Sequence, residues 1–121
     1  MEPAYHNLQF VVLDKHRNKQ SITRGDVIAF YCEGLDATLV KRVVGIPGDK
    51  VVIADKVLYV NDEAYKDAVF EYAGVAEREI QLENENFFVI GDNISKSKDS
   101  RYSVVGLVSS DKIVGVVLGE K

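Results

Sequence analysis

The sequence predicts an all-β, or mainly β, fold built of many short strands, with a small inserted lobe. Short apolar runs rich in Val, Ile and Phe recur along the chain, and turn-forming residues separate them. No segment of useful length repeats its apolar residues with the 3.6-residue period of a helix. Many short strands joined by turns are typical of layered or closed β architectures.

The strand patterns are clearest in the first half of the chain. Turn residues such as Arg24-Gly25-Asp26 and Pro47-Gly48-Asp49 separate apolar runs, and Ala54-Asp55-Lys56 joins two of them into a predicted hairpin. The strands expected in this half are 10–13, 27–31, the run from Leu39 to Gly45, 51–53 and 57–60.

The second half begins with a looser, acidic segment, 62–86, in which Phe70, Tyr72 and Ile80 are isolated apolar anchors. A strand at 87–90, a polar loop at 91–101 and an apolar run at 113–118 follow it. A chain of 121 residues is long enough for one core but too short for two full ones. We therefore expect one domain over 1–121, with a β core formed by 1–61 and 87–121 and a small variable insertion at 62–86.

Composition excludes several classes of protein. The chain is 46% hydrophobic and 28% charged, as in ordinary globular proteins, and its net charge of -4 comes without a basic cluster that would bind nucleic acid. Cys32 is the single cysteine, so neither an internal disulfide nor a thiolate metal cluster can form, and His6 and His16 stand apart in polar surroundings. We expect no metal site. No apolar run approaches the ~20 residues that span a bilayer, so we expect this chain itself to be soluble.

The run from Leu39 onward places a lysine among apolar residues. In an extended strand Lys41 shares a face with Leu39 and Val43, while Arg42 points to the opposite face. Burial disfavours the charged ammonium, so such a lysine could accept a proton from a serine hydroxyl. The alternative is a lysine at a sheet edge whose head reaches water past its neighbours.

The loop 91–101 is dense in hydroxyl and charged side chains for a segment that leaves an apolar strand. It is either a solvated turn, with Asx and Ser hydrogen bonds to its own backbone, or a support for a buried amine. In the second case a serine hydroxyl holds the lysine rotamer, because it can donate or accept a hydrogen bond.

Three segments together resemble the boxes of bacterial type I signal peptidases, membrane-bound serine proteases that use a Ser-Lys dyad. They are Arg24-Gly25-Asp26-Val27-Ile28-Ala29-Phe30, the run Val40-Lys41-Arg42-Val43-Val44-Gly45-Ile46-Pro47-Gly48-Asp49, and Gly91-Asp92-Asn93 with Ser97, Asp99, Ser100 and Arg101. Their order and spacing make the resemblance specific, and with the intervening hairpin it covers nearly the whole chain. It implies the signal-peptidase, LexA-like β-ribbon fold, with 62–86 as the variable second lobe.

The resemblance also implies roles for individual residues. Lys41 would be the general base, and Ser97 would orient its amine. Asp99 and Arg101 would form a salt bridge that shapes the site. Arg42 and Asp92 would support it from behind. The supporting set is Arg42, Asp92, Asp99, Ser100 and Arg101.

The nucleophile is expected outside this chain. Met1-Glu2-Pro3 resembles the end of the family's Ser-Met-x-Pro segment, so the serine would stand directly before Met1. Without it, Lys41 has nothing to activate, and we expect the chain as given to be a fragment that is inactive as a protease. Two smaller departures are Ile94, where the family often has arginine, and a link at 101–106 that is about two residues longer than usual.

The implied substrates are signal peptides of secreted preproteins, cut after small residues. The strand Thr38-Leu39-Val40 would pair with the extended substrate, and Met1 and Val40 would wall a small apolar pocket. The full-length protein would lie in the bacterial cell membrane with this domain on the extracytoplasmic side, against the membrane surface. No metal or organic cofactor is implied.

Two other functions stay open. The first is a non-catalytic relative that binds preproteins or pilin subunits as an assembly factor, although a buried Lys41 would then cost stability without a use. The second is a self-cleaving regulator related to phage-type repressors. That function requires an upstream DNA-binding segment and an internal cleavage site, and neither is present in this sequence.

Overall fold

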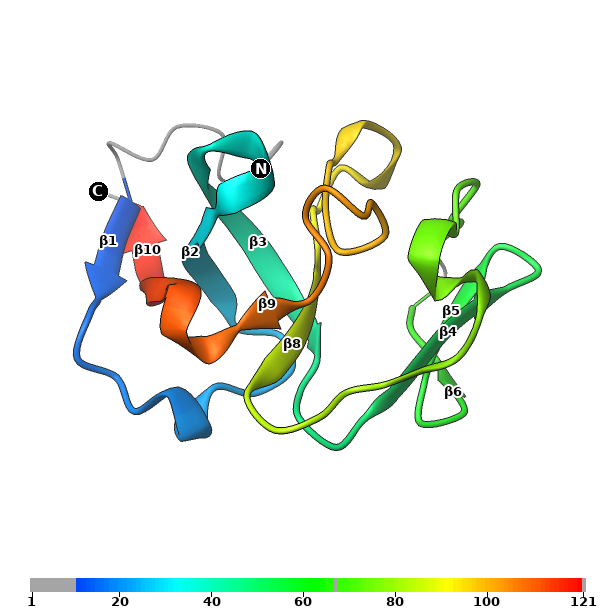
Figure 1. Cartoon of the computed structure of the whole chain (residues 1–121), viewed down its shortest axis with the longest axis horizontal. Coiled ribbons are helices and arrows are strands. Elements are labelled where there is room, and N and C mark those ends of the chain that lie inside the picture. Colours follow the sequence, from blue (N-terminus) through cyan, green and yellow to red (C-terminus); the bar gives the residue numbers. More distant parts are fainter. Residues whose placement is uncertain (1–10, 67, 121) are drawn as a thin grey trace.

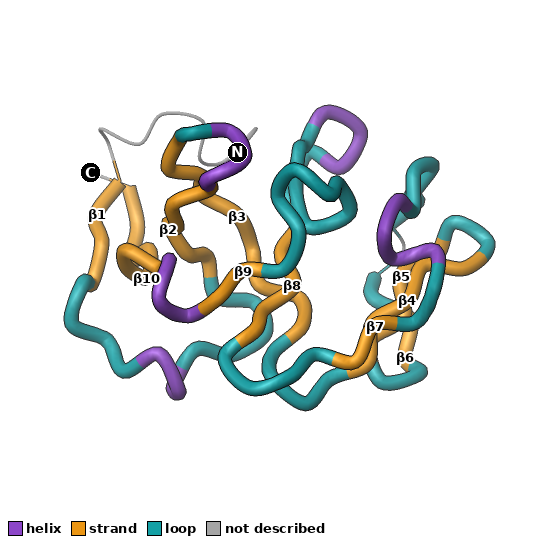
Figure 2. Tube along the Cα trace, in the orientation of Figure 1, coloured by secondary structure: helices purple, strands orange, loops and turns teal. Residues whose placement is uncertain are grey.

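The computed structural model describes residues 11–66 and 68–120 and confirms a fold of short antiparallel strands. Within this part of the chain, helical structure is confined to short 3-10 turns (Figure 2). None of these helices is long and apolar enough to cross a bilayer. The strands are β1 (Val11–Asp14), β2 (Val27–Cys32), β3 (Ala37–Gly45), β4 (Lys50–Ala54), β5 (Val57–Val60), β6 (Glu63–Ala64), β7 (Ile80–Gln81), β8 (Asn86–Ile90), β9 (Val108–Ser109) and β10 (Ile113–Glu120). The 3-10 turns are η2 (Lys19–Ser21), η3 (Glu33–Leu35), η4 (Gly74–Glu77), η5 (Ile94–Lys96) and η6 (Ser110–Lys112).

The strands form two sheets that lie beside each other in Figure 1. The larger sheet has the order β1-β10-β2-β3-β8-β9, and the smaller has the order β6-β5-β4-β7. The chain passes from β3 in the larger sheet to β4 in the smaller one through the turn at Pro47-Gly48, and it returns from β7 to β8. The smaller sheet is therefore an excursion between two neighbouring strands of the larger sheet.

Strands β3 and β8 contribute side chains to a core on each of their faces. Val43 and Val89 join the cluster of the larger sheet, whereas Val44 and Phe88 join a cluster with residues of the smaller sheet. Because neighbouring side chains in a strand point to opposite faces, β3 and β8 are shared by both cores. This places β3, which carries Lys41, at the centre of the molecule.

The hairpin predicted at 51–60 is present, with β4 and β5 joined by Asp55 and Lys56. Both turn residues have positive φ, 54° and 66°, as a two-residue type I′ turn requires. The hairpin pairs with β6 and β7, both from the segment 62–86, and so belongs to a different sheet from the other strands of 1–61. An isolated β4–β5 ribbon would have unpaired backbone groups along the outer edges of both strands. Pairing with β7 and β6 gives these groups hydrogen-bond partners.

Of the three apolar anchors expected in 62–86, Phe70 is fully buried and Ile80 is half-buried. Tyr72 differs from the expectation, since it is 48% exposed and stacks on Tyr102 with ring centroids 4.6 Å apart. A tyrosine can bury one face of its ring against a neighbour while its hydroxyl stays in water.

Candidate active site

Lys41 lies in the middle of β3, where it pairs with Ile28 of β2. Its side chain is 8% exposed, and Leu39 and Val43, two residues to either side, pack with the core of the larger sheet. The alternation expected from the sequence therefore holds, and the lysine is buried rather than reaching water past its neighbours.

The Lys41 amine contacts a hydroxyl from the loop after β8. Nζ donates a hydrogen bond of 3.0 Å to Ser97 Oγ, and Ser97 itself is buried. The two residues are 56 positions apart in sequence, so only the pairing of β3 with β8 brings them together.

Burial is the main influence on the protonation of this amine. It lowers the pKa of Lys41 below the ordinary value, because the buried ammonium loses its hydration. The Asp99 carboxylate raises the pKa and the Arg101 guanidinium lowers it, both by smaller amounts. A larger fraction of Lys41 is therefore neutral near pH 7 than of an exposed lysine, and a neutral amine can accept a proton.

Gly91 makes room for this contact. A Cβ atom at position 91 would overlap Ser97 Oγ and would lie 3.4 Å from Lys41 Nζ. Only a glycine allows the backbone after β8 to pass so close to the pair. The sequence motif included Gly91, but its steric role follows from the folded structure alone.

Asp99 and Arg101 form a buried ion pair in the same loop. The guanidinium donates two hydrogen bonds to the carboxylate, from Nε at 2.8 Å and from a terminal nitrogen at 2.9 Å. Asp99 also accepts from the backbone N–H of Gly91 at 3.2 Å. Within the described residues, every buried side-chain nitrogen and oxygen has a hydrogen-bond partner. Ser97, Asp99, Ser100 and Arg101 are therefore buried and hydrogen-bonded, whereas Ser95, Lys96 and Lys98 of the same loop are exposed.

Ser100 fastens the loop to the backbone of β8. Its Oγ accepts from the N–H of Val89 at 2.9 Å, and its own N–H donates to the Val89 carbonyl at 3.0 Å. The side chain is fully buried. These contacts suit a supporting residue, because they fix the path of the loop rather than contacting the Lys41 amine.

Arg42 and Asp92 pair on the other side of β3. Two hydrogen bonds of 2.9 Å join the guanidinium to the carboxylate, and the guanidinium also donates to the carbonyl of Gly25. The hydrogen bonds from Arg42 hold the pKa of Asp92 below its ordinary range. This pair therefore connects β3, the turn before β2 and the first residues of the loop after β8.

The strand segment expected to bind substrate is partly open. β3 pairs with β2 from Ala37 onward, whereas its pairing with β8 begins only at Arg42. Within the described residues, no strand pairs with the second edge of β3 between Ala37 and Lys41. This edge can accept an additional strand.

The three residues of this segment differ in burial. Thr38 is exposed and Leu39 half-buried, while Val40 is buried and packs with Val27 and Ala29. Met1, which we expected to line a pocket with Val40, lies outside the described residues.

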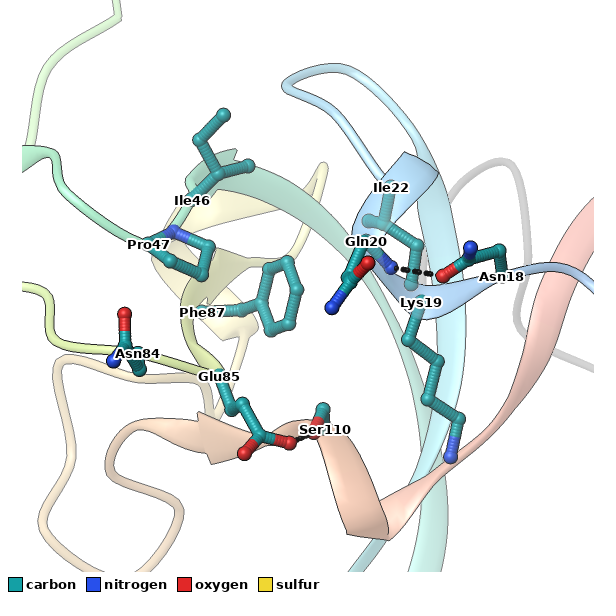
Figure 3. A pocket seen from close by; sticks show the side chains of 10 residues that line it. All are labelled: Asn18, Lys19, Gln20, Ile22, Ile46, Pro47, Asn84, Glu85, Phe87 and Ser110. Carbon is teal, nitrogen blue, oxygen red and sulfur yellow. Dashed lines mark hydrogen bonds between the residues drawn. The ribbon is translucent and has the colours of Figure 1, made fainter.

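A separate groove of about 820 Å³ lies where η2, η6 and the start of β8 approach one another (Figure 3). Its lining combines the apolar side chains of Ile22 and Phe87 with the amides of Asn18, Gln20 and Asn84. It contains none of the residues that the sequence predicted for the site. No motif pointed to this groove, because its lining comes from segments that are distant in sequence.

The fold and the site together define a class: an antiparallel β protein in which a buried lysine is held by a serine hydroxyl. The chain belongs to the signal peptidase family, because a family profile described as "Signal peptidase, peptidase S26" matches residues 1–119. The family resemblance and the fold class expected from the sequence are confirmed.

Individual relatives agree with this family. Signal peptidase I U of Bacillus subtilis is 32% identical over 127 residues, an alignment that covers 95% of this chain and 67% of the relative. Signal peptidase IB of Staphylococcus aureus is 36% identical over 115 residues, covering 79% of this chain and 59% of the relative. The chain thus spans about two thirds or less of these curated relatives.

A solved structure is also similar. The crystal structure of a signal peptidase I from Enterococcus faecalis V583 matches with a TM-score of 0.63 and 27% sequence identity. The match covers 79% of this chain and 96% of that chain.

Proposed function

We propose that this chain is the catalytic domain of a serine endopeptidase that removes signal peptides from secreted preproteins by a Ser-Lys dyad. The observation that carries the proposal is the buried Lys41 amine held 3.0 Å from Ser97 Oγ. Membership of the signal peptidase family supports the substrate class.

Lys41 acts as the general base. Its neutral amine takes the proton of the nucleophilic hydroxyl, which belongs to a serine directly before Met1, and that oxygen attacks the scissile carbonyl. Lys41 then returns the proton to the leaving amine, and water hydrolyses the acyl-enzyme. A chain without that serine retains the base but has no hydroxyl to activate, so it does not cleave.

Ser97 orients the amine of Lys41, and the buried pair Asp99–Arg101 orients Ser97. The hydrogen bond that Lys41 donates to Ser97 leaves the lysine with few rotamers, which saves part of the entropy cost of reaching the reactive geometry. Ser100 and the pair Arg42–Asp92 hold the surrounding backbone, as their contacts with Val89 and Gly25 support.

The substrate binds in an extended conformation along Thr38-Leu39-Val40. The edge of β3 without a strand partner in the described residues supports this docking mode, because an added strand gains backbone hydrogen bonds. In the full-length protein the domain faces the extracytoplasmic side of the bacterial membrane, where signal peptides emerge.

The test is cleavage of a signal-peptide substrate by an extended form of the chain that carries a serine directly before Met1. Four proteins are compared: this extended form, the same form with Lys41→Ala, the same form with Lys96→Ala, and the chain as it stands. Lys96 is an exposed lysine of the loop after β8 and is the matched control. We expect cleavage by the extended form and its Lys96→Ala variant only.

Loss of the general base lowers the rate by about 10²-fold or more. Cleavage that persists unchanged in the Lys41→Ala variant contradicts the dyad. A folded extended form that binds the substrate without cleaving it contradicts the protease proposal and favours the preprotein-binding assembly factor.

A further inference from the structure

Residues 70–76, called the clamp segment below, contact the loop that carries Ser97. The link is direct, because the N–H of Val75 donates to the carbonyl of Arg101 at 2.9 Å. In the opposite sense, the Arg101 guanidinium donates to the carbonyl of Tyr72 at 3.3 Å. Arg101 is therefore bonded to the clamp segment through its backbone and through its side chain.

Gly74 allows this approach for two independent reasons. Its φ of +56° lies in the left-handed region that side chains disfavour. A Cβ atom there would also overlap the carbonyl oxygen of Arg101 and lie 2.7 Å from the Tyr72 ring. The clamp segment can reach Arg101 only because residue 74 has no side chain.

Side chains of the clamp segment also pack against the loop. The Phe70 ring is fully buried and lies 5.5 Å from the Arg101 guanidinium carbon, at the distance of a cation–π contact. The Tyr72 ring stacks on Tyr102, the residue after Arg101. These contacts hold Arg101 in addition to its ion pair with Asp99.

Arg101 also bonds to the backbone of the loop that holds Ser97 beside Lys41. Its guanidinium donates to the carbonyls of Ile94 at 2.8 Å and Ser97 at 3.4 Å, in addition to Asp99. A shift of Arg101 therefore moves the backbone that carries the Ser97 hydroxyl.

We propose that Gly74 and the clamp segment are positioning elements that hold Arg101, and through it Ser97, in place beside Lys41. This inference rests on the proposed function, and it assigns a role in the site to a segment between β6 and β7 that touches no reacting group.

A test can follow the Lys41 amine in the chain as it stands. The charged groups that influence it are Asp99 and Arg101, both in the loop that the clamp segment supports. If that loop loosens, water reaches the amine, and the charges of Asp99 and Arg101 move away together. Their influences on the pKa of Lys41 oppose each other, whereas burial is the largest influence and lowers it. Renewed hydration therefore raises the pKa of Lys41 toward the ordinary lysine value.

The experiment compares Gly74→Ala with Gly106→Ala by NMR titration of lysine ¹³Cε signals. Gly106 is the matched control, because its φ of +64° imposes similar backbone strain while an added Cβ would meet nothing closer than 3.7 Å. We expect the titration of Lys41 to move to higher pH in Gly74→Ala and to stay at the wild-type value in Gly106→Ala. In the extended form with the serine, kcat falls about tenfold or more with KM changed less, since a misplacement of about 1 Å costs up to ~10²-fold.

Each outcome decides the inference. An equal shift of the Lys41 titration in both variants, or none in Gly74→Ala, overturns it. If Gly74→Ala does not fold, Tyr72→Ala replaces it, because Tyr72 is half-exposed and the change removes its ring stack on Tyr102 but keeps the backbone carbonyl that accepts from Arg101. A smaller shift in the same direction then supports the inference, and no shift overturns it.

The two proposals fail in different ways. Lack of Lys41-dependent cleavage by the extended form, together with a titration that moves only in Gly74→Ala, contradicts the protease and retains the positioning role. Cleavage that requires Lys41, together with a titration indifferent to residue 74, retains the protease and removes the positioning role.

Discussion

Lys41 is a residue whose burial opposes the stability of the fold. Its amine is buried among apolar neighbours, with a serine hydroxyl as hydrogen-bond partner and a pKa lowered by that burial. Burial of the amine lowers the free energy of unfolding at any pH at which the lysine is protonated in the unfolded chain. This loss of stability can therefore be measured as a function of pH.

Lys41→Met is expected to stabilise the protein at pH 7 by roughly 1–2 kcal/mol, because it fills the same space without an ionisable group. The folded pKa lies below the unfolded one, so between the two values the unfolded chain binds more protons. Wild-type stability therefore rises with pH through that window, and the advantage of the variant shrinks as pH approaches 10. Urea unfolding at several pH values measures the difference.

Lys96→Met is the control for this prediction, since Lys96 is an exposed lysine of the loop after β8. Its stability difference from wild type is expected to be small at every pH. A Lys41→Met variant that is less stable than wild type at pH 7 would contradict the account of a destabilising buried amine.

Gly91→Ala is expected to displace Ser97, because the new Cβ would overlap Ser97 Oγ. In the extended form with the serine before Met1, we expect cleavage to fall by about 10²-fold, as small misplacements near the reacting groups do. The measurement is the cleavage rate of a signal-peptide substrate, together with urea unfolding to record the loss of stability.

The double variant Gly91→Ala with Ser97→Gly separates these two effects. Removing the Ser97 side chain removes the overlap, so stability recovers, whereas the orienting hydroxyl is still missing and activity does not recover. Full activity in Gly91→Ala would show that the close approach at residue 91 is not needed.

Among the elements, those with a strong local pattern were the ones that the sequence predicted. The alternation around Lys41 and Arg42 placed the two side chains on opposite faces, because the period of a strand is fixed. The hairpin β4–β5 followed from two apolar runs on either side of a short turn. In both cases the information lies within about ten residues.

Short elements that depend on distant partners were not predictable. Strands β6, β7 and β9 have two residues each, and they exist because an edge of another strand offers them hydrogen bonds. The motifs indicated Ser97, Asp99 and Arg101 as site residues. The contribution of Gly74 could not be predicted, because it too depends on a distant partner. Its contact with Arg101 depends on how the segment between β6 and β7 packs against the loop after β8.

Asp49 fastens the turn between β3 and β4, where the chain passes from one sheet to the other. The buried carboxylate accepts two hydrogen bonds from Arg24, at 2.8 and 2.6 Å, and one each from the Ile46 N–H and the Asn61 amide. Burial raises the pKa of Asp49, but these hydrogen bonds outweigh it and hold the pKa below its ordinary value. The carboxylate thus connects the beginning of β2, the end of β3 and the end of β5.

Asp49→Asn is expected to destabilise the protein by roughly 1.5–3 kcal/mol at pH 7, since it removes the buried charge that accepts the hydrogen bonds of Arg24, Ile46 and Asn61. Because the folded pKa is lowered, the contribution of Asp49 is fully present above the unfolded pKa of about 3.9 and is lost as pH falls through the folded value. Urea unfolding at pH 7 and pH 3 is expected to show a large difference that narrows in acid. Asp62→Asn, at an exposed position, is the control and is expected to change little. If the difference in unfolding free energy between wild type and Asp49→Asn widens in acid, this role of Asp49 is contradicted.

For the molecule as a whole, the shared strands β3 and β8 determine how the two sheets unfold. Val43 and Val89 belong to the core of the larger sheet, and Val44 and Phe88 belong to the core that includes the smaller sheet. Neither core is complete without both strands. We therefore expect one cooperative transition, in which loss of the smaller sheet also dismantles the site around Lys41.

Leu58→Ala tests this coupling, because Leu58 lies in β5 of the smaller sheet and is fully buried beside Val44 and Phe88 in their cluster. The cavity is expected to cost about 2–5 kcal/mol of unfolding free energy. Far-UV circular dichroism and the ¹³Cε signal of Lys41 should report the same lowered midpoint in urea.

Val69→Ala, at a side chain that is 59% exposed, is the control, with an expected change within about 0.5 kcal/mol. A Lys41 signal that keeps its wild-type midpoint while the circular dichroism transition shifts or splits would show that the two sheets unfold independently. The smaller sheet would then be a separate lobe whose unfolding leaves the site around Lys41 intact.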